Sequence, residues 1–234
     1  MSAVLEARSL RKTFRGGDGN LIEVLAGVDL SVSRGEFVAI MGVSGAGKST
    51  LLHLLGALEL PTSGDVLLES VNFTQRSASE LAEVRNRKIG FVFQFHHLLR
   101  EFSALENVMM PLLIGGRDES AARSRAEELL AAVGLAGRMT HRPAQLSGGE
   151  QQRVAVARAL VNDPVVVLAD EPSGNLDQFN GERLHDLFAT LSREFETALV
   201  AVTHNGMLAA RADRVLMLEA GRLIPHPGVE SLPS

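Results

Sequence analysis

The chain has 234 residues and contains no cysteine. Disulfide bonds and thiolate chemistry are therefore excluded, and the absence fits a protein of the cytoplasm. The first residues, MSAVLEARSLRKTF, contain no apolar h-region and no small-residue cleavage site. No segment approaches the roughly 20 apolar residues that a membrane-spanning helix needs. We therefore expect a soluble protein, which can still dock on a membrane protein.

An excess of positive charge is also absent. Lys and Arg total 23 against 28 Asp and Glu, which gives a formal net charge of -5. Surfaces that bind nucleic acid are usually basic, so we expect no nucleic-acid partner. The sequence shows no internal repeat and no low-complexity tract. Its 45% hydrophobic content is enough for a substantial core, in one large domain or in a domain with a subdomain.

Strand and helix patterns alternate along much of the chain. Val165–Glu171 and Leu199–His204 are continuous apolar runs, which is typical of parallel strands covered on both faces. The segment between them, NGERLHDLFATLSREF, predicts a helix. Glu36–Gly42 predicts another buried strand, followed by a helix near Ser49–Leu58. Two strand patterns flank the glycine-rich turn Gly16–Gly19. The fold class is therefore α/β, with a mostly parallel sheet and an antiparallel β region near the start.

The middle of the chain has a different, helical character. DESAARSRAEELLAAVGL predicts a helix that is capped by Asp118 or Ser120 and ends at Gly134. A second helix begins near SGGEQQRVAVARALV. We expect residues from approximately 95 to 160 to form a helical subdomain inserted into the α/β core. RVLMLEAGRL, with a turn at Ala220–Gly221, predicts a closing hairpin.

GVSGAGKST matches the pattern G-x-x-x-x-G-K-[ST]. Its glycines allow backbone N–H groups to converge on phosphate oxygens, and the following helix presents the positive end of its dipole. Lys48 would neutralise the β- and γ-phosphates, and Ser49 would bind Mg²⁺. The alternative is an ordinary glycine-rich turn, but the strand before the loop and the helix after it favour phosphate binding. The residues of the loop are Gly42, Val43, Ser44, Gly45, Ala46, Gly47, Lys48, Ser49 and Thr50.

VVVLADE ends an apolar strand with two consecutive carboxylates. Ligands of open parallel sheets bind at the carboxyl ends of the strands. Asp170 can hold Mg²⁺ directly or through water, and Glu171 can orient or polarise an attacking water. The alternative is a pair of solvated acids at the end of a strand.

LSGGEQQRVAVARAL predicts a helix with Ser147 at its N-cap. The free N–H groups at a helix start bind anions, yet the glycine loop already supplies a phosphate cradle. A second anion-binding helix start makes sense if Ser147, Gly148 and Gly149 close over the γ-phosphate from another subunit. A capped helix with a flexible start is the alternative.

Together these motifs resemble the ATP-binding subunits of ABC transporters. GVSGAGKST is similar to their Walker A motif, LSGGE to their signature, VVVLADE to their Walker B motif and GNLD to their D-loop. His204 aligns with their switch histidine, and Gln94 with the Q-loop glutamine that senses Mg²⁺ and the γ-phosphate. Phe14 aligns with the aromatic that stacks on adenine. The motifs occur in the family's order and cover almost the entire chain, as a single ABC ATPase domain over residues 1–234 with a P-loop NTPase core.

The segment FVFQFHHLL places His96, His97 and Leu98 just after Gln94. These histidines could bind a metal, could be packed or solvated, or could dock a partner. No cysteine or nearby His/Glu cluster supplies further metal ligands. The family's Q-loop faces the transmembrane subunits, which implies docking. QFHHLLREFSALENVMMPLLIGG is similar to the same stretch of bacterial lipoprotein-releasing ATPases.

The resemblance implies a Mg²⁺-dependent ATPase at the cytoplasmic face of the inner membrane. It would form a head-to-tail homodimer that sandwiches two ATP molecules, with the signature acting in trans. Two integral membrane permease subunits would couple hydrolysis to the release of lipoprotein cargo. Lys48 and the loop amides would hold phosphates, Ser49, Gln94 and Asp170 would organise Mg²⁺, and Glu171 and His204 would act in hydrolysis. Macrolide-efflux-type exporters and cell-division-type mechanotransmission complexes, which share GNLD, are alternatives. DNA-repair relatives usually carry coiled-coil or zinc insertions, for which this chain has no room.

Overall fold

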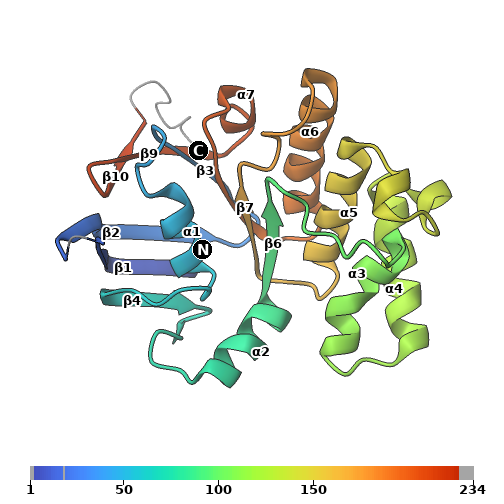
Figure 1. Cartoon of the computed structure of the whole chain (residues 1–234), viewed down its shortest axis with the longest axis horizontal. Coiled ribbons are helices and arrows are strands. Elements are labelled where there is room, and N and C mark those ends of the chain that lie inside the picture. Colours follow the sequence, from blue (N-terminus) through green and yellow to red (C-terminus); the bar gives the residue numbers. More distant parts are fainter. Residues whose placement is uncertain (1–2, 18, 227–234) are drawn as a thin grey trace.

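Two β-sheets enclose a short helix and form the body of the molecule (Figure 1). The structure is a computed structural model that describes residues 3–17 and 19–226. Asp18, within the predicted turn Gly16–Gly19, lies outside the described residues. Among those residues, no helix is both long and apolar enough to cross a lipid bilayer.

The smaller sheet is antiparallel and has the strand order β2-β1-β4-β5. Its two long strands flank the predicted glycine-rich turn, and its two short strands form the following hairpin. The antiparallel β region expected near the start of the chain is therefore present. The strands are β1 (Ala3–Arg15), β2 (Leu21–Ser33), β4 (Ser63–Leu68) and β5 (Val71–Asn72).

The larger sheet has the order β10-β9-β3-β8-β7-β6, and every neighbouring pair is parallel except β9 and β10. This confirms the mostly parallel sheet. The closing hairpin turns at Ala220 and Gly221, which have φ angles of 46° and 72°. The strands are β3 (Phe37–Met41), β6 (Ile89–Phe93), β7 (Val166–Asp170), β8 (Ala198–Val202), β9 (Arg214–Glu219) and β10 (Arg222–Pro225).

Seven α-helices occur within the described residues. Asp118, one of the two predicted caps, accepts hydrogen bonds from the backbone N–H groups of Ser120 and Ala121 at 3.0 and 3.3 Å. Gly134 has a φ of 74° and follows the last turn of this helix, as predicted. The helices are α1 (Lys48–Leu55), α2 (Ala78–Lys88), α3 (Ala104–Ile114), α4 (Glu119–Ala132), α5 (Gly148–Leu160), α6 (Gln178–Glu194) and α7 (Gly206–Ala209).

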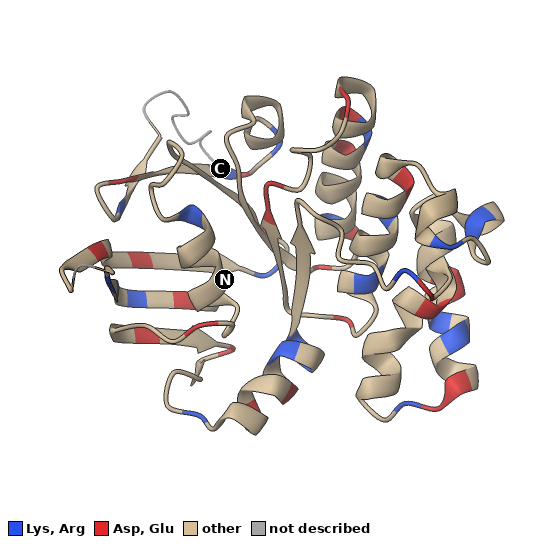
Figure 2. Ribbon diagram, in the orientation of Figure 1, with Lys and Arg blue, Asp and Glu red and all other residues tan. Residues whose placement is uncertain are grey.

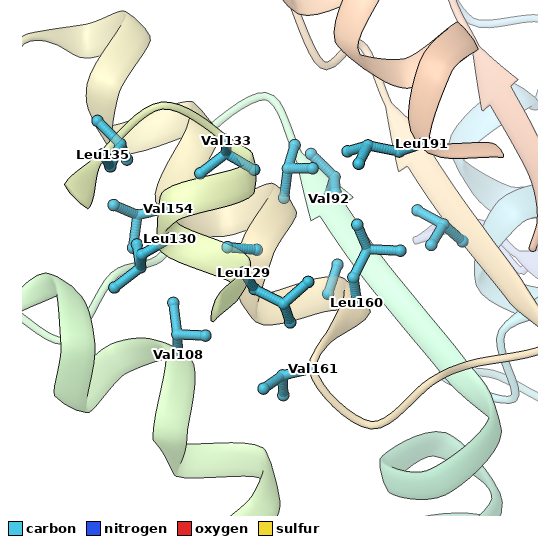
Figure 3. Close-up of a cluster of buried hydrophobic side chains, with 14 of the residues drawn as sticks. Val92, Val108, Leu129, Leu130, Val133, Leu135, Val154, Leu160, Val161 and Leu191 are labelled. Atoms are coloured by element: carbon cyan, nitrogen blue, oxygen red, sulfur yellow. The ribbon is translucent and has the colours of Figure 1, made fainter. Parts of the chain in front are cut away.

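Helices α3, α4 and α5 share one continuous core with strand β6 and helix α6 (Figure 3). Val108 of α3, Leu130 of α4 and Val154 of α5 lie together at one end of this cluster, while Val92 of β6 and Leu191 of α6 lie at the other. All of these side chains are buried. Burial of apolar surface stabilises a fold by roughly 25 cal/mol per Å². The helical region is therefore held firmly against the sheet.

Charged side chains are distributed over the helices and hairpins, whereas the central strands carry few (Figure 2). Both faces of the parallel sheet are covered, one by α1 and the antiparallel sheet and the other by α5 and α6. Charges without partners are costly in such an interior. Asp170 and Glu171 are therefore acceptable only at the end of β7, where the chain leaves the sheet.

Candidate active site

The carboxyl ends of adjacent parallel strands meet at one edge of the larger sheet. Phe93 at the end of β6 is paired with Asp170 at the end of β7, and Asp170 is paired with Val202 at the end of β8. Val202 is paired in turn with Ile40 of β3. The residues that follow these strands therefore emerge side by side, and this register brings three of the predicted motifs together.

The loop after β3 has the backbone geometry of a phosphate cradle. Gly45 and Gly47 have φ angles of 78° and 97°, which favour glycine. A Cβ atom at Gly47 would lie 2.7 Å from Cγ1 of Val24, so strand β2 presses directly on the loop. Lys48 begins helix α1, and its Nζ donates to the carbonyl oxygens of Gly42 and Val43 at 2.8 and 3.1 Å. The loop therefore holds the lysine ammonium beside the N–H groups at the helix start.

Asp170 lies beside Ser49, the second residue of helix α1. Burial raises the pKa of Asp170 above its ordinary value, and a hydrogen bond with the Ser49 side chain opposes this rise. The nearby side chains of His53 and Lys48 also lower the pKa of Asp170, while Glu171 raises it. A hydroxyl and a carboxylate oxygen in contact are the hard ligands that Mg²⁺ takes.

Glu171 is held by the loop after β8. Its Oε2 accepts hydrogen bonds from Oγ1 of Thr203 at 3.0 Å and from the backbone N–H of His204 at 3.2 Å. Its Oε1 lies 2.9 Å from Nδ1 of His204. A carboxylate has about four lone-pair positions, so these contacts leave one for a further donor such as water. The positive φ of Glu171, 43°, marks the sharp turn that directs the chain away from the sheet.

His204 is oriented by this contact and is otherwise open to solvent. Its side chain is 74% exposed, whereas that of Glu171 is 15% exposed. Because an ionised carboxylate only accepts hydrogen bonds, the network assigns a proton to Nδ1 of His204. Its Nε2 is then the ring atom left for a ligand at the mouth of the site.

Gln94 leaves the end of β6 and contacts the turn after Glu171. Its Nε2 donates to Oδ1 of Asn175 at 3.0 Å, and Nδ2 of Asn175 donates to the backbone carbonyl of Gln94 at 3.1 Å. The glycine loop, the two acids, the glutamine and the histidine thus gather at one edge of the sheet. Phosphate binding followed by attack of an activated water is the chemistry that this set supports.

Comparison with known proteins agrees with this geometry. A profile for ABC transporters matches residues 25–174. This chain belongs to the ABC transporter family. It is 53% identical over 221 residues to the lipoprotein-releasing system ATP-binding protein LolD of Syntrophus aciditrophicus, covering 94% of this chain and 99% of the relative. It is 54% identical to the LolD protein of Xanthomonas campestris pv. campestris, covering 95% and 92% of the two chains.

A solved structure supports the same assignment. The dimeric ATP-binding cassette MJ0796, in a post-hydrolysis state bound to ADP and Pi, superposes with a TM-score of 0.85. Its sequence is 40% identical, and the match covers 94% of this chain and 96% of the other. The resemblance to ABC ATP-binding subunits and the predicted fold class are therefore confirmed.

The signature of this ABC cassette lies apart from the glycine loop. Ser147, Gly148 and Gly149 begin helix α5, whose position in Figure 1 is across the central sheet from α1. Ser147 caps α5 by accepting from the N–H of Glu150, whose carboxylate accepts in turn from the backbone N–H of Ser147. This backbone hydrogen bond is the main reason that the pKa of Glu150 is lowered to about 2. One chain therefore does not bring the signature to its own phosphate loop.

Phe14, the predicted adenine-stacking residue, lies on the antiparallel sheet. It belongs to β1, is paired with Ile22 of β2 and is 37% exposed. The Lys12 ammonium lies 4.9 Å from the centre of its ring. Since Val24 of β2 contacts the phosphate loop, the sheet that carries Phe14 borders the cradle. Stacking of Phe14 on adenine stays a prediction.

His96, His97 and Leu98 do not all face the same way. Arg158 of helix α5 donates to the backbone carbonyls of His96 and His97, at 2.8 Å each, and so fixes the loop. Burial lowers the pKa of His96, against an opposing effect of the nearby backbone of Gly148. His97 is exposed and Leu98 packs on the helical core. His96 thus lies next to the signature, and His97 is the residue available to a partner.

Sequence reasoning missed Thr203 and Asn175 as functional residues. Asn175 lies within GNLD and Thr203 directly precedes His204, so the signal was available. What the motifs do not reveal is that Thr203 bonds to Glu171 and Asn175 to Gln94. These pairs are 32 and 81 residues apart, and only the sheet register brings them together.

A buried histidine beneath the D-loop predicts a dependence of stability on pH. His185 of α6 is 1% exposed, and its Nε2 lies 2.9 Å from Oγ of Ser173, while Nδ1 has no partner among the described residues. Burial lowers the pKa of His185, and Arg211 lowers it further, against the opposing effects of Asp186 and Glu182. As the pH falls, His185 is therefore protonated at a higher pH in the unfolded chain than in the folded protein. The free energy of unfolding consequently decreases as the pH drops below about 6.5.

We expect His185→Gln to weaken this pH dependence. The amide can still reach Ser173, but it does not titrate. The decrease in the free energy of unfolding at acid pH should therefore become smaller by up to about 1 kcal/mol per pH unit. Urea unfolding of both proteins at about pH 7.5 and pH 5.5 measures the effect. An equal loss of stability between these two pH values in both proteins would show that His185 does not cause the pH dependence. His141→Gln, which changes a histidine outside this buried pair, serves as the control.

Proposed function

We propose that this ABC cassette hydrolyses ATP to power the release of lipoproteins from a bacterial inner membrane. The observation that carries the proposal is the identity of 53% to a lipoprotein-releasing ATP-binding protein over nearly the full length of both chains. A second relative at 54%, from Xanthomonas campestris, carries the same name. The site geometry supports the ATPase chemistry independently.

The chain's own groups account for the binding of phosphates. The amides of the loop from Gly42 to Gly47 and the ammonium of Lys48 receive the phosphate oxygens. Ser49 and Asp170 are in contact, and no group of three or more His, Cys, Asp or Glu side chains within the described residues could hold a metal alone. This donor set fits Mg²⁺ that is bound together with phosphate oxygens. When bound, Mg²⁺ neutralises charge that develops on the phosphates.

Glu171 and His204 serve the attacking water. The remaining lone pair of the Glu171 carboxylate accepts a hydrogen bond from water and takes its proton as the water oxygen attacks the γ-phosphorus. The bond between the γ-phosphorus and the β–γ bridging oxygen breaks, and ADP leaves with this oxygen. Thr203 and His204 hold this carboxylate in place through the contacts at 2.9 to 3.2 Å. His204 then supports charge at the γ-phosphate, and Gln94 would help to hold Mg²⁺.

A homodimer completes the site. Ser147, Gly148 and Gly149 of one subunit cover the γ-phosphate held by the other subunit, because helix α5, which they begin, lies across the central sheet from α1 in their own chain (Figure 1). The solved relative of 40% identity is dimeric. ATP closes this dimer and hydrolysis reopens it.

Two membrane permease subunits respond to the closing and reopening of this dimer. A groove of about 390 Å³ lies between β6 and helices α2 and α3, with apolar side chains such as Leu58, Phe91, Met110 and Ile114 in its lining. Leu58, Leu99 and Ile114 of this lining are 46%, 43% and 71% exposed, and a group of exposed apolar side chains is typical of a surface that a partner covers. The groove adjoins the loop of His96 and His97 through Arg158, which contributes to both. The cassette itself is peripheral, at the cytoplasmic face of the membrane.

Substitution of the two histidines tests the docking surface. His96→Ala combined with His97→Asn should leave ATP affinity unchanged and should weaken assembly with the permeases by about tenfold, as for loss of roughly 1.4 kcal/mol. Asn is chosen because His97 has a φ of 47°, which Asn adopts readily. The Arg158 contacts involve main-chain carbonyls, so the loop is retained.

Co-purification with the permeases and transport in reconstituted vesicles measure this effect. His141→Ala, a half-buried histidine of the helical region, is the control and should assemble normally. Unchanged assembly and transport in the double variant would rule out docking through these histidines.

The function itself is tested by affinity purification of tagged Glu171→Gln protein from its native membranes, with mass spectrometry of the bound proteins. Two different integral membrane subunits together with lipid-modified proteins are expected. One repeated membrane subunit with an efflux adaptor, or with regulators of cell-wall hydrolases, would indicate a sister branch of the family. Recovery without any membrane partner would contradict the transporter assignment.

A further inference from the structure

The side-chain amide of Gln94 is bonded to a neighbour that determines which of its two ends is free. Asn175, in the turn after Glu171, both accepts from Nε2 of Gln94 and donates to its backbone carbonyl, at 3.0 and 3.1 Å. The two residues are separated by 81 positions in the sequence. Two bonds between the same pair define the relative orientation of the amides more narrowly than one bond could.

Hydrogen-bond chemistry fixes the orientation of both amides. The backbone carbonyl of Gln94 can only accept, so Asn175 must direct its Nδ2 to it. The Oδ1 of Asn175 then faces Gln94, and because this oxygen also can only accept, Gln94 must present its Nε2. The Oε1 of Gln94 is left on the other side of the amide, and no hydrogen bond among the described residues ends on it.

Gly174 adds an independent constraint on the same amide. A Cβ atom at this position would lie 2.9 Å from Nε2 and 3.2 Å from Cδ of Gln94, so the turn packs flat against the glutamine. The turn is itself anchored. The N–H of Gly174 donates to the carbonyl of Glu171 at 3.0 Å, and Ser173 contacts the buried His185.

We propose that Asn175 is a positioning residue that presents the amide oxygen of Gln94 to the Mg²⁺-nucleotide complex. An amide oxygen is a suitable ligand for Mg²⁺ or for its bound water, whereas an amide nitrogen is not. Gln94 follows Phe93, which is paired with Asp170, so the oriented amide emerges beside the acids of the site. This inference rests on the proposed role of Gln94 in organising Mg²⁺.

Binding of ATP, measured without turnover, tests the inference. In full-length protein carrying Glu171→Gln, calorimetric titration with ATP in excess Mg²⁺ and in EDTA gives the gain in affinity that Mg²⁺ provides. Asn175→Ala should reduce this gain by about fivefold, the size of one neutral hydrogen bond. Affinity in EDTA should not change, because Asn175 contacts no phosphate-binding group of the loop.

Three further variants make the result specific. Gly174→Ala should reproduce the loss, because its methyl group displaces the amide of Gln94 by contact at 2.9 Å. Asn175→Ala should add nothing to Gln94→Ala, since both act on the same oxygen. Gln178→Ala removes an exposed amide of the next helix whose only hydrogen bond within the described part of the chain is to Glu182, and the variant should behave as the parent protein.

The outcomes separate the two levels of the proposal. If Gln94→Ala leaves the gain from Mg²⁺ unchanged, the role of Gln94 is wrong and the inference falls with it. If Gln94→Ala lowers the gain while Asn175→Ala and Gly174→Ala do not, Asn175 has no positioning role although the proposed function stands. Additive losses in the double variant would likewise overturn the inference, because Asn175 would then act independently of Gln94.

Discussion

Replacing Glu171 by Gln should lower ATP turnover on the order of 10²- to 10⁴-fold, the contribution of a general base. Gln has the shape of Glu, and its amide oxygen can still accept from Oγ1 of Thr203 and from the backbone N–H of His204, so the loop after β8 should keep its place. The amide does not take a proton at neutral pH, and the attacking water therefore stays inactive. Release of phosphate in steady state measures the loss.

ATP affinity of the Glu171→Gln protein should remain near the parent value, because the carboxylate contacts neither the glycine loop nor Lys48 through any hydrogen bond of the described residues. Since hydrolysis reopens the dimer, the variant should accumulate as an ATP-bound dimer, which light scattering after size exclusion detects. Glu219→Gln, at the end of β9 in the same sheet, is the matched control. Turnover at the parent rate in Glu171→Gln would show that another group activates the water.

Substitution of Gly90 by Ala should destabilise the protein by about 3 kcal/mol, near the upper end for added volume in a packed interior. Gly90 lies in β6, and a Cβ atom there would be 2.3 Å from the backbone carbonyl oxygen of Ala159 in α5. The clash is between the new methyl group on β6 and the backbone of α5, so rotation of a side chain cannot relieve it. Helix α5 would have to move away from the sheet and carry the signature with it.

Urea unfolding should reveal the loss as a lower midpoint with an unchanged slope. Gly137→Ala is the control, since nothing lies within 4 Å of its Cβ position, and its stability should change by no more than about 0.5 kcal/mol. A Gly90→Ala protein as stable as the parent would mean that α5 can shift without loss of packing. In that case its distance from β6 would not be a determinant of the signature's position.

Most of the larger elements followed from local sequence patterns. Helices α2 and α3 are the two exceptions that these patterns did not predict, and each has a clear cause. Among the residues of α2 only Leu81 is buried, so this helix lacks the apolar stripe by which a surface helix is recognised. Helix α3 contains Pro111, a residue that normally ends a helix. Asn86 of α2 donates to the carbonyl of Pro111 at 3.0 Å, so the two helices support each other in a way that neither sequence segment reveals.

The sequence alone identified the groups that we propose to carry the chemistry. A phosphate loop needs its glycines, lysine and serine within a few consecutive residues, and the paired acids need only the end of one strand, so each is visible as a short motif. Ser147 with Glu150 is likewise a local cap, separated by three residues.

Tertiary structure decided how those groups are held. Thr203 reaches Glu171, Asn175 orients Gln94, and Arg158 fixes the loop of His96 and His97, across 32, 81 and up to 62 residues of sequence. Such partners are brought together by the register of parallel strands and by the packing of α5 on β6. A hydrogen bond tolerates a variation of only a few tenths of an ångström in the distance between donor and acceptor. The pattern of residues along a chain does not contain this information.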